Sequence, residues 1–443
     1  KALTAMIAAS IAATALPAAA MVSNLTNTLT SSNSAGANSA APQTTNAAPQ
    51  NTAIAPAAAP ETSTQTGAPA VQAEPSAESM FTYEDVDGGV AITGFKTDDA
   101  SFTSNVVIPP TIDGKTVVAL KNNNFLNCMT GADQITSLDT SLCTSLSIGD
   151  YAFRYCTGIT SVDLSKCTSI GNSAFDGCSG ITGPVNLSSC NSIGNGAFYG
   201  CSGITEVTWS TSIDTIPEGC FNGCTSLKTF NSETDFNLSG ITSIGSYAFY
   251  GCEGITGSVD LSKCTSIEHY AFYNCSGITS VDLSSCNSIG NSAFYGCEGI
   301  TGPVNLSSCN SIGNSAFYLC SSITGPVNLS SCNSIEDYAF YNCSGITSVD
   351  LSSCNSIGNY AFSSCSGITE VTWSTNIDTI PAGCFNACTN LKTFNSETDG
   401  ECNLSGITTI EDSAFQKCTG ITGSVDLSKC TSIGNSAFSG CSG

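Results

Sequence analysis

The stretch GITSVDLSSCNSIGNSAFYGC, residues 277–297, decides the fold of this chain. Val281 and Leu283 are two residues apart and therefore share one face of an expected strand, while Asp282 between them points to the opposite face, into solvent. The Ser, Asn and Gly residues that follow end the strand. A second set of apolar or small residues then returns the chain to the core: Ile289, Ala293, Phe294 and Cys297. The stretch predicts one coil of a larger, repeating structure.

This pattern recurs to the end of the chain. Fourteen of the twenty phenylalanines are followed three residues later by cysteine, from Phe125 with Cys128 to Phe438 with Cys441, and most of the later ones are 22 or 23 residues apart. A period of this length is typical of solenoids, in which each unit is too small to bury its apolar side without its neighbours. We therefore predict a repeat solenoid, mostly β and irregular, with one parallel strand ladder per coil set and with Phe and Cys ladders inside.

Two departures from the basic coil are informative. Coils that contain ITGPVNL, as at residues 181–187, have one extra residue before the second apolar position, and the downstream register is unchanged, so we expect a bulge at the start of the strand. A longer block, residues 203–235, recurs with few changes at 367–399. In both copies an insertion follows, FNSETDFNLSG at 230–240 and FNSETDGECNLSG at 394–406, which we interpret as a loop that the stack does not need.

Composition divides the chain into four parts. Residues 1–20 combine a lysine, an Ala-rich apolar run and three consecutive alanines, which predicts a secretory signal peptide with its first residues missing. Residues 21–79 are almost wholly Ala, Pro, Ser, Thr, Asn and Gln, which predicts a disordered, flexible stalk. We assign residues 80–127 to an N-terminal β cap with the first coil, and residues 128–443 to the solenoid. No polar cap follows Cys441, so we expect the natural protein to continue beyond this fragment.

The charge balance limits the possible partners. The chain has 443 residues, a formal net charge of −24 and only eleven basic residues. Neutralisation of a phosphate backbone is not available, so nucleic acid and anionic membrane surfaces are excluded as default partners. No stretch reaches the roughly 18 apolar residues that a membrane-spanning helix needs. The acidic balance suits either solubility or attraction to a basic partner.

Cysteine positions argue against a disulfide framework. Of the 26 cysteines, fourteen stand three residues after Phe, and Cys220 and Cys384 replace the Ala that precedes Phe in most other coils. Nine more stand three residues after the last strand position: Cys143, Cys167, Cys190, Cys264, Cys286, Cys309, Cys332, Cys354 and Cys430. We interpret these 25 as buried structural thiols, with partial cross-linking as the alternative. Cys402, in the second insertion, has no place in these ladders, and we interpret it as an exposed thiol, either incidental or a linkage point.

Catalytic and metal chemistry have little support in the sequence. His269 is the sole histidine and occupies a slot that carries Asp or Asn in other coils, so we interpret it as a surface variant. Zinc is not expected because C-x-x-C pairs are absent. Asp85 to Gly88, DVDG, is better explained by a hairpin turn than by a calcium loop. We therefore expect no enzyme activity, no cofactor and no metal.

Two sets of polar residues are candidates for binding. The first set shares the outward slot between the two strand apolar residues: Asp163, Asn186, Asp260, Asp282, Asn305, Asn328, Asp350 and Asp426. The second set lies in the two insertions: Glu233, Asp235, Glu397 and Asp399. The first set is either a solvated edge that keeps the solenoid soluble or a recognition face for a protein or glycan, and calcium between neighbouring Asp pairs is a weaker alternative. Trp209 and Trp373 replace Leu in the inward slot, which favours core packing over sugar stacking.

The repeat unit C-x-G-I-T-x-V-D-L-S-x-C-x-S-I-G-N-x-A-F-x-x-C resembles the BspA-like leucine-rich repeat. Ile108-Pro109 matches the I-P step of that family, whereas most coils here have L-S and are one residue shorter in this segment. The resemblance, over about residues 80–443, implies a secreted or cell-surface protein that adheres to host or microbial proteins or glycans. We expect an extracellular, monomeric binding module, with a structural spacer for another domain as the alternative.

Overall fold

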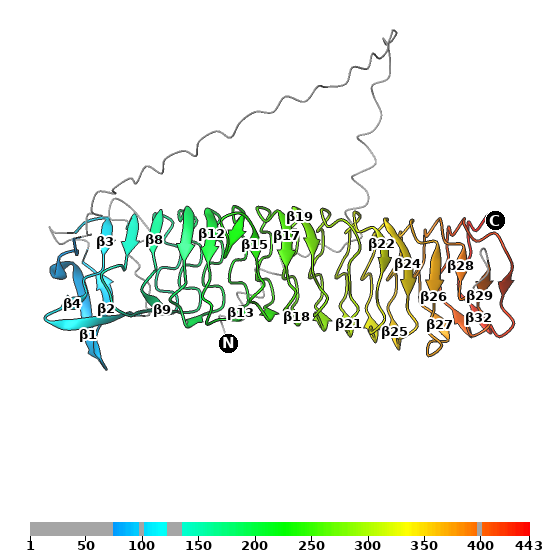
Figure 1. Ribbon diagram of the computed structural model, residues 1–443, viewed down its shortest axis with the longest axis horizontal. Helices are drawn as coiled ribbons and strands as arrows, with labels where there is room; N and C mark the ends of the chain where they lie inside the picture. The colour runs from blue at the N-terminus through cyan, green and yellow to red at the C-terminus, as the bar shows by residue number, and fades with distance from the viewer. Residues whose placement is uncertain (1–73, 97–101, 122–134, 397–400) are drawn as a thin grey trace, which may run out of the picture. The chain divides into compact units, whose positions relative to one another are not determined.

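Residues 74–96, 102–121, 135–396 and 401–443 are described by the computed structural model (Figure 1). They form short strands that stack coil upon coil, and the one helical segment among these residues is a single 3-10 turn, η1, Glu78–Met80. The predicted repeat solenoid is confirmed. The predicted signal peptide and all but the last six residues of the predicted stalk lie outside the described residues, as do Phe125 and Cys128.

The N-terminal part of the stack begins with a hairpin. β1 (Phe81–Val86) pairs antiparallel with β2 (Gly89–Phe95), and β2 pairs parallel with β5 (Lys115–Leu120), which also pairs with β4 (Thr111–Ile112). Gly88 has a φ of +87°, which glycine adopts without a steric penalty. The DVDG stretch is therefore the hairpin turn that the sequence predicts.

Two strand ladders run along the stack, one more than the sequence analysis predicts. We call the strands at the V-D-L positions the first ladder and those at the S-I positions the second ladder, and the two rows can be followed in Figure 1. The first ladder contains β3 (Asn105–Val107), β6 (Ser137–Asp139), β8 (Ser161–Asp163), β10 (Gly183–Asn186), β12 (Ile204–Thr208), β14 (Thr229–Phe230), β15 (Phe236–Asn237), β17 (Gly257–Asp260), β19 (Ile278–Val281), β22 (Gly325–Val327), β24 (Ile346–Asp350), β26 (Glu370–Thr372), β28 (Thr393–Phe394), β29 (Cys402–Asn403) and β31 (Val425–Asp426). The second ladder continues from β5 with β7 (Leu146–Ile148), β9 (Cys167–Ile170), β11 (Ser192–Ile193), β13 (Thr215–Ile216), β16 (Ser243–Ile244), β18 (Ser266–Ile267), β20 (Ser288–Ile289), β21 (Ser311–Ile312), β23 (Ser334–Ile335), β25 (Ser356–Ile357), β27 (Thr379–Ile380), β30 (Thr409–Ile410) and β32 (Ser432–Ile433).

The extra residue of the longer coils forms the expected bulge. The register between β10 and β12 shifts at Gly183, and the same shift occurs at Gly257 and Gly325. These three glycines have φ values of +87°, +83° and +83°, a conformation that disfavours residues with a Cβ. The G in ITGPVNL and its variants therefore absorbs the insertion before the strand begins.

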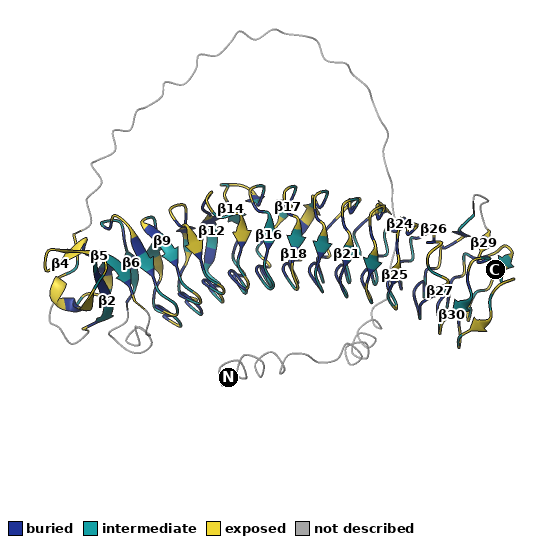
Figure 2. Ribbon diagram, turned by 90° about the horizontal axis from the view of Figure 1, so that it is seen from below, coloured by how far each residue is buried: buried dark blue, intermediate teal, exposed yellow. Residues whose placement is uncertain are grey.

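The interior is built from the predicted Phe ladder. From Phe153 to Phe438 the rings of successive coils stack with centroids 5.2–5.9 Å apart and planes within 18° of parallel. Buried and exposed positions alternate along each coil (Figure 2). Because each ring contacts the rings above and below it, a coil buries its apolar side only in the presence of its neighbours.

The cysteine three residues after each Phe has a specific structural role. The Cys297 thiol donates a hydrogen bond to the carbonyl oxygen of Phe272 in the preceding coil, with Sγ and O 3.1 Å apart, and the Cys320 thiol bonds in the same way to Phe294. The same contact recurs from Cys178 to Cys441. A thiol fits this slot because it is small, apolar enough to be buried and still able to donate a weak hydrogen bond.

Proline interrupts the second ladder at the two tryptophan-containing coils. In ordinary coils the N–H that follows the S-I strand donates to the Ile carbonyl of the preceding coil, as Gly194 does to Ile170 at 2.8 Å. Pro217 and Pro381 stand at this position and have no N–H to donate. The sheet accordingly ends at β11 and starts again at β13, and it ends at β25 and starts again at β27.

Candidate binding surfaces

The first candidate surface is the Asp/Asn row, the eight residues of the outward strand slot. Seven of the eight are exposed and Asp163 is half-buried. Register partners place this slot on neighbouring strands, as with Asn237 opposite Asp260 and Asn305 opposite Asn328. The structure therefore stacks the row along the first ladder, as the sequence predicts.

Each member of the Asp/Asn row also has a structural role that the sequence analysis did not foresee. Its Oδ1 accepts a hydrogen bond from the backbone N–H of the serine two residues later, at 2.9–3.1 Å. This is an Asx turn, and it ends the strand. Aspartate and asparagine both supply Oδ1, which explains why either residue type occurs in this slot. The second oxygen, or the amide nitrogen, is not needed by the turn.

The Asx turn leads to a pH prediction at Asp282. Hydrogen bonds from the Ser284 side chain and backbone lower the pKa of Asp282. A carboxyl whose pKa is lower in the folded state stabilises the fold above its unfolded pKa, near 3.9, and this contribution is lost as the pH falls through the folded pKa. We therefore expect Asp282→Asn to retain the turn at pH 7 and to be less sensitive than the parent to acid below about pH 4.

Chemical denaturation at pH 7 and at pH 3 checks this prediction. Asp282→Ala serves as the control, because it removes Oδ1 and should lose about 0.5–1.5 kcal/mol of unfolding free energy at pH 7. An Asp282→Asn variant that matches Asp282→Ala at pH 7 would show that the turn does not depend on Oδ1.

The first insertion is not the free loop that the sequence analysis proposed. Phe230 in β14 pairs with Phe236 in β15, and Phe236 pairs with Val259 in the next coil, so the insertion adds one strand to the first ladder. Both phenylalanines are buried. The five residues between these two strands, 231–235, make the connection, and Glu233 and Asp235 are exposed there. In the second copy, Glu397 and Asp399 lie outside the described residues.

The interpretation of Cys402 as an exposed thiol is wrong. Cys402 is 1% exposed and lies in β29, where it pairs with Phe394 and Val425. It occupies the position that Phe236 has in the first copy, since both are followed by Asn-Leu-Ser-Gly. Burial raises the pKa of the Cys402 thiol to about 12. Cys402 is therefore a core residue and not an accessible linkage point.

The two tryptophans are core residues, as the sequence favours. Trp209 and Trp373 are each 2% exposed, and each indole N–H donates to a main-chain oxygen, of Ile213 at 3.1 Å and of Ile377 at 3.0 Å. Neither ring face is available to a sugar. His269 has a similar structural role at the surface, because its Nδ1 accepts from the Asn291 N–H at 2.8 Å.

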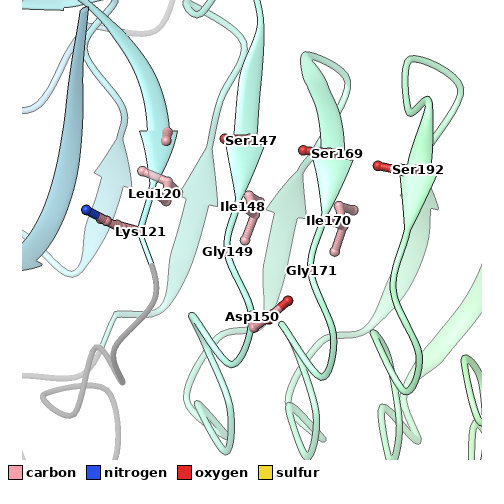
Figure 3. A pocket seen from close by; sticks show the side chains of 11 residues that line it. Leu120, Lys121, Ser147, Ile148, Gly149, Asp150, Ser169, Ile170, Gly171 and Ser192 are labelled. Carbon is pink, nitrogen blue, oxygen red and sulfur yellow. The ribbon is translucent and has the colours of Figure 1, made fainter. Parts of the chain in front are cut away.

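An open trough of about 430 Å³ lies along β5, β7, β9 and β11. Figure 3 shows Ser147, Ser169 and Ser192 side by side on three of these strands, with Asp150 near the next turn. The Lys121 ammonium at its end forms an ion pair with Glu84. A similar trough of about 350 Å³ follows β27, β30 and β32. Both troughs are open to solvent along the second ladder, so neither encloses a small molecule.

A surface rich in tyrosine is not among the sites predicted from the sequence. Twelve of the thirteen tyrosines stand two residues before, or one or two residues after, a ladder Phe. We call these twelve the tyrosine edge: Tyr151, Tyr155, Tyr199, Tyr247, Tyr250, Tyr270, Tyr273, Tyr295, Tyr318, Tyr338, Tyr341 and Tyr360. Those with the greatest exposure are Tyr199, at 47%, and Tyr155, at 45%. The spacing of these tyrosines from the ladder Phe residues is the sequence feature that predicts this surface.

Five rings of the tyrosine edge form a continuous column. Tyr250, Tyr273, Tyr295, Tyr318 and Tyr341 stack with centroids 4.7 Å apart and planes within 13° of parallel. Burial raises the pKa values of Tyr273 and Tyr318 to about 12, so their hydroxyl groups stay protonated at physiological pH. The column therefore presents a line of ring edges and hydroxyl groups, while the faces of its three inner rings are covered by neighbouring rings.

The repeated coil that carries these surfaces is found in known proteins. A sequence profile described as the BspA type leucine rich repeat region matches residues 146–238, 232–347 and 310–443, with six copies. These segments make up more than half of the chain. The chain belongs to the BspA-type leucine-rich repeat family. The expected family resemblance is thus confirmed, and no curated protein sequence matches the chain.

Solved structures of leucine-rich repeat proteins are similar to this BspA-type chain. One is a leucine-rich repeat protein from Bacteroides ovatus, with 21% identity and a TM-score of 0.57 over 82% of this chain and 91% of that protein. Another is a leucine-rich cell surface protein from Faecalibacterium prausnitzii, with 21% identity and a TM-score of 0.46 over 82% of this chain and 97% of that protein. At this identity, the first similarity supports the fold alone.

Among the residues that the structure describes, no three His, Cys, Asp or Glu side chains are grouped so that they could hold a metal ion. Within the same residues, no helix is both long and apolar enough to cross a membrane. The expectations that the chain is not an enzyme and needs no cofactor stay predictions.

Proposed function

We propose that this chain is an exported, cell-surface adhesion module that binds an extracellular protein or glycan through the outer surface of its coils. The proposal is supported by membership in the BspA-type leucine-rich repeat family, since the resemblance to that family implies an adhesive surface protein. It is also supported by the composition of residues 1–20, which is typical of a secretory signal peptide, and of residues 21–79, which is typical of a flexible stalk.

One observation carries the proposal: most of the described coils present Asp or Asn in the same outward slot of a regular stack. Parallel strands are about 4.8 Å apart, so a partner with a repeating or extended surface can contact many coils at once. Repeat scaffolds commonly bind through such extended surfaces. The Asp/Asn row, Glu233 and Asp235 remain candidate contacts, and Glu397 and Asp399 are the corresponding candidates in the second copy.

Binding of the full chain to an array of matrix proteins and glycans tests this function. Two variants separate the candidate surfaces. The first replaces Glu233, Asp235, Glu397 and Asp399 with serine, and the second replaces Asp260, Asp282 and Asp350 with asparagine, which keeps Oδ1 for the Asx turns.

Each outcome points to a different surface. Binding lost only in the serine variant would place recognition at the insertions, and binding lost only in the asparagine variant would place it on the Asp/Asn row. If the parent chain retains no ligand above the level of a heat-unfolded control, the adhesion function is contradicted and the spacer function is favoured.

A further inference from the structure

The tyrosine edge has an interruption in its middle. Tyr247 stacks on Tyr270 with ring centroids 4.8 Å apart, and Tyr338 stacks on Tyr360 at 5.1 Å, so each pair adds a second line of rings beside the five-ring column. Between these pairs, the same slot holds Ser292 and Ser315. The flanks of Tyr295 and Tyr318 therefore have no second ring beside them.

The interruption is a change of side chain and not of backbone. Ser292 and Ser315 each have a φ of +54°, and Tyr270 and Tyr338 have φ values of +58° and +57° in the same slot. The backbone at the interruption is thus the one that already carries tyrosine in neighbouring coils. Ser315 also donates its backbone N–H to the backbone carbonyl oxygen of Asp337 at 2.9 Å, so an acidic residue lies in the adjacent coil beside it.

The tyrosine edge is acidic. Between Tyr199 and Tyr360, the turn segments around the ladder Phe residues carry six carboxylates: Glu218, Glu253, Glu268, Glu298, Glu336 and Asp337. The two lysines of this interval, Lys228 and Lys263, stand instead beside strands β14 and β17 of the first ladder. Five of the six carboxylate residues are exposed, and Asp337 is half-buried. The only arginine of the chain, Arg154, lies farther along the edge, where it pairs with Asp176 at 2.7 Å.

We propose that the tyrosine edge binds a basic polypeptide, an extended segment rich in arginine or lysine whose long side chains reach the interruption at the half-buried Ser315, next to the buried Ser292. This inference rests on the proposed binding function and names the class of partner. The aliphatic part of an arginine or lysine side chain packs on the exposed ring edges, and its charged end bonds to tyrosine hydroxyl oxygens and to carboxylates such as Asp337. Aromatic side chains are enriched in protein interfaces, and opposite charge accelerates association.

Other partners fit this surface less well. Sugars and proline rings stack on open aromatic faces, but the faces of Tyr273, Tyr295 and Tyr318 are covered by stacked rings on both sides. A second copy would bring two chains of net charge −24 together, and nucleic acid would bring phosphate to the same carboxylates. A basic polypeptide matches both the charge and the line of hydroxyl groups.

Charge reversal on the edge is the first test, with labelled oligoarginine as the probe and the full chain as the receptor. Glu253→Lys with Glu298→Lys is expected to weaken binding by on the order of tenfold. Asp87→Lys with Glu370→Lys makes the same change of net charge at exposed sites away from the edge and should change binding by less than about twofold. Equal weakening in both variants would overturn the proposal, because it would assign the binding to overall acidity.

Filling the interruption is the second test. Ser292→Tyr with Ser315→Tyr completes the second line of rings and should weaken oligoarginine binding by on the order of tenfold. Ser413→Tyr is the matched control, because it makes the same substitution in the same slot and backbone conformation, at a φ of +57°, beyond the tyrosines. Circular dichroism and unfolding midpoints confirm that the variants fold. Unchanged binding in the double variant overturns the proposal.

The outcomes also separate this inference from the proposed function. If the parent chain does not bind oligoarginine but retains an array ligand, the function stands and the basic partner is wrong. The partner class is likewise wrong if dextran binds in an edge-dependent way, or if sedimentation shows that the edge joins two copies of the chain.

Discussion

Replacing Phe294 by alanine is expected to lower the unfolding free energy by about 3–5 kcal/mol, the largest loss that a single ring deletion normally gives. Phe294 is fully buried, and its ring centroid lies 5.3 Å from those of Phe272 and Phe317. The substitution removes two ring contacts and leaves a cavity between three coils, which neighbouring rings fixed by their own stacking cannot fill.

Urea unfolding measures the loss, and hydrogen exchange locates it. Since each coil contacts mainly its neighbours, exchange should increase first in the coils of Phe272 and Phe317. Phe294→Leu is the control and should lose less, because it keeps much of the buried volume. A loss below about 1 kcal/mol for Phe294→Ala would contradict an inward Phe ladder.

Replacing Trp209 by alanine is expected to cost a similar amount, about 3–5 kcal/mol. The indole packs edge to face against Phe221, with centroids 5.8 Å apart, and its N–H bonds to the Ile213 oxygen. The loss of the ring creates a cavity and also leaves the Ile213 carbonyl without that donor. Trp209→Phe separates the two effects, because it restores most of the ring and not the donor.

The duplicated block provides an internal control for this prediction. Trp373 makes the same contacts, with Phe385 at 5.9 Å and with the Ile377 oxygen. Urea unfolding of Trp373→Ala should therefore give a loss within about 1 kcal/mol of that for Trp209→Ala, apart from end effects near the last coils. The blue-shifted fluorescence of a buried indole is expected from each single-tryptophan protein, and emission typical of water would contradict core packing.

The coil itself could be predicted because it depends on local spacing. The alternation at Val281 and Leu283, the return at Phe294 and the bulge in ITGPVNL all follow from which residues must point inward. The second ladder was not predictable in this way, since most of its strands are two residues long and show no alternation of inward and outward side chains. Its strands form only because stacked coils bring equivalent Ser and Ile residues into register.

The structure of the two insertions could not be predicted from their length. An insertion of a few residues can be a loop or an added strand, and only the pattern inside it distinguishes the two. Phe236-Asn237-Leu238-Ser239 has the same order of inward and outward residues as Val-Asp-Leu-Ser in the ordinary coil, and Cys402 begins the same pattern in the second copy. That comparison places Cys402 in the core.

The candidate surfaces were only partly predictable. The stacking of the Asp/Asn row followed from periodicity, but the Asx turn depends on backbone geometry after the strand. The tyrosines had a visible register relative to Phe, yet their pairing into a column depends on ring orientation between coils, as for Tyr295 and Tyr318. The interruption at Ser292 and Ser315 has meaning only once that column is known.

The most direct test of the coil stack is a distance between spin labels on the second ladder. Ser243 and Ser356 are joined by five steps of strand pairing through Ser266, Ser288, Ser311 and Ser334. Both doubly labelled proteins have Cys128, Cys430 and Cys441 replaced by alanine. Labels at Ser243→Cys and Ser356→Cys should report about 24 Å between the backbones. Labels at Ser288→Cys and Ser356→Cys should report about 14 Å. A separation that does not increase by one strand spacing per coil would contradict the in-register stack on which every surface described above depends.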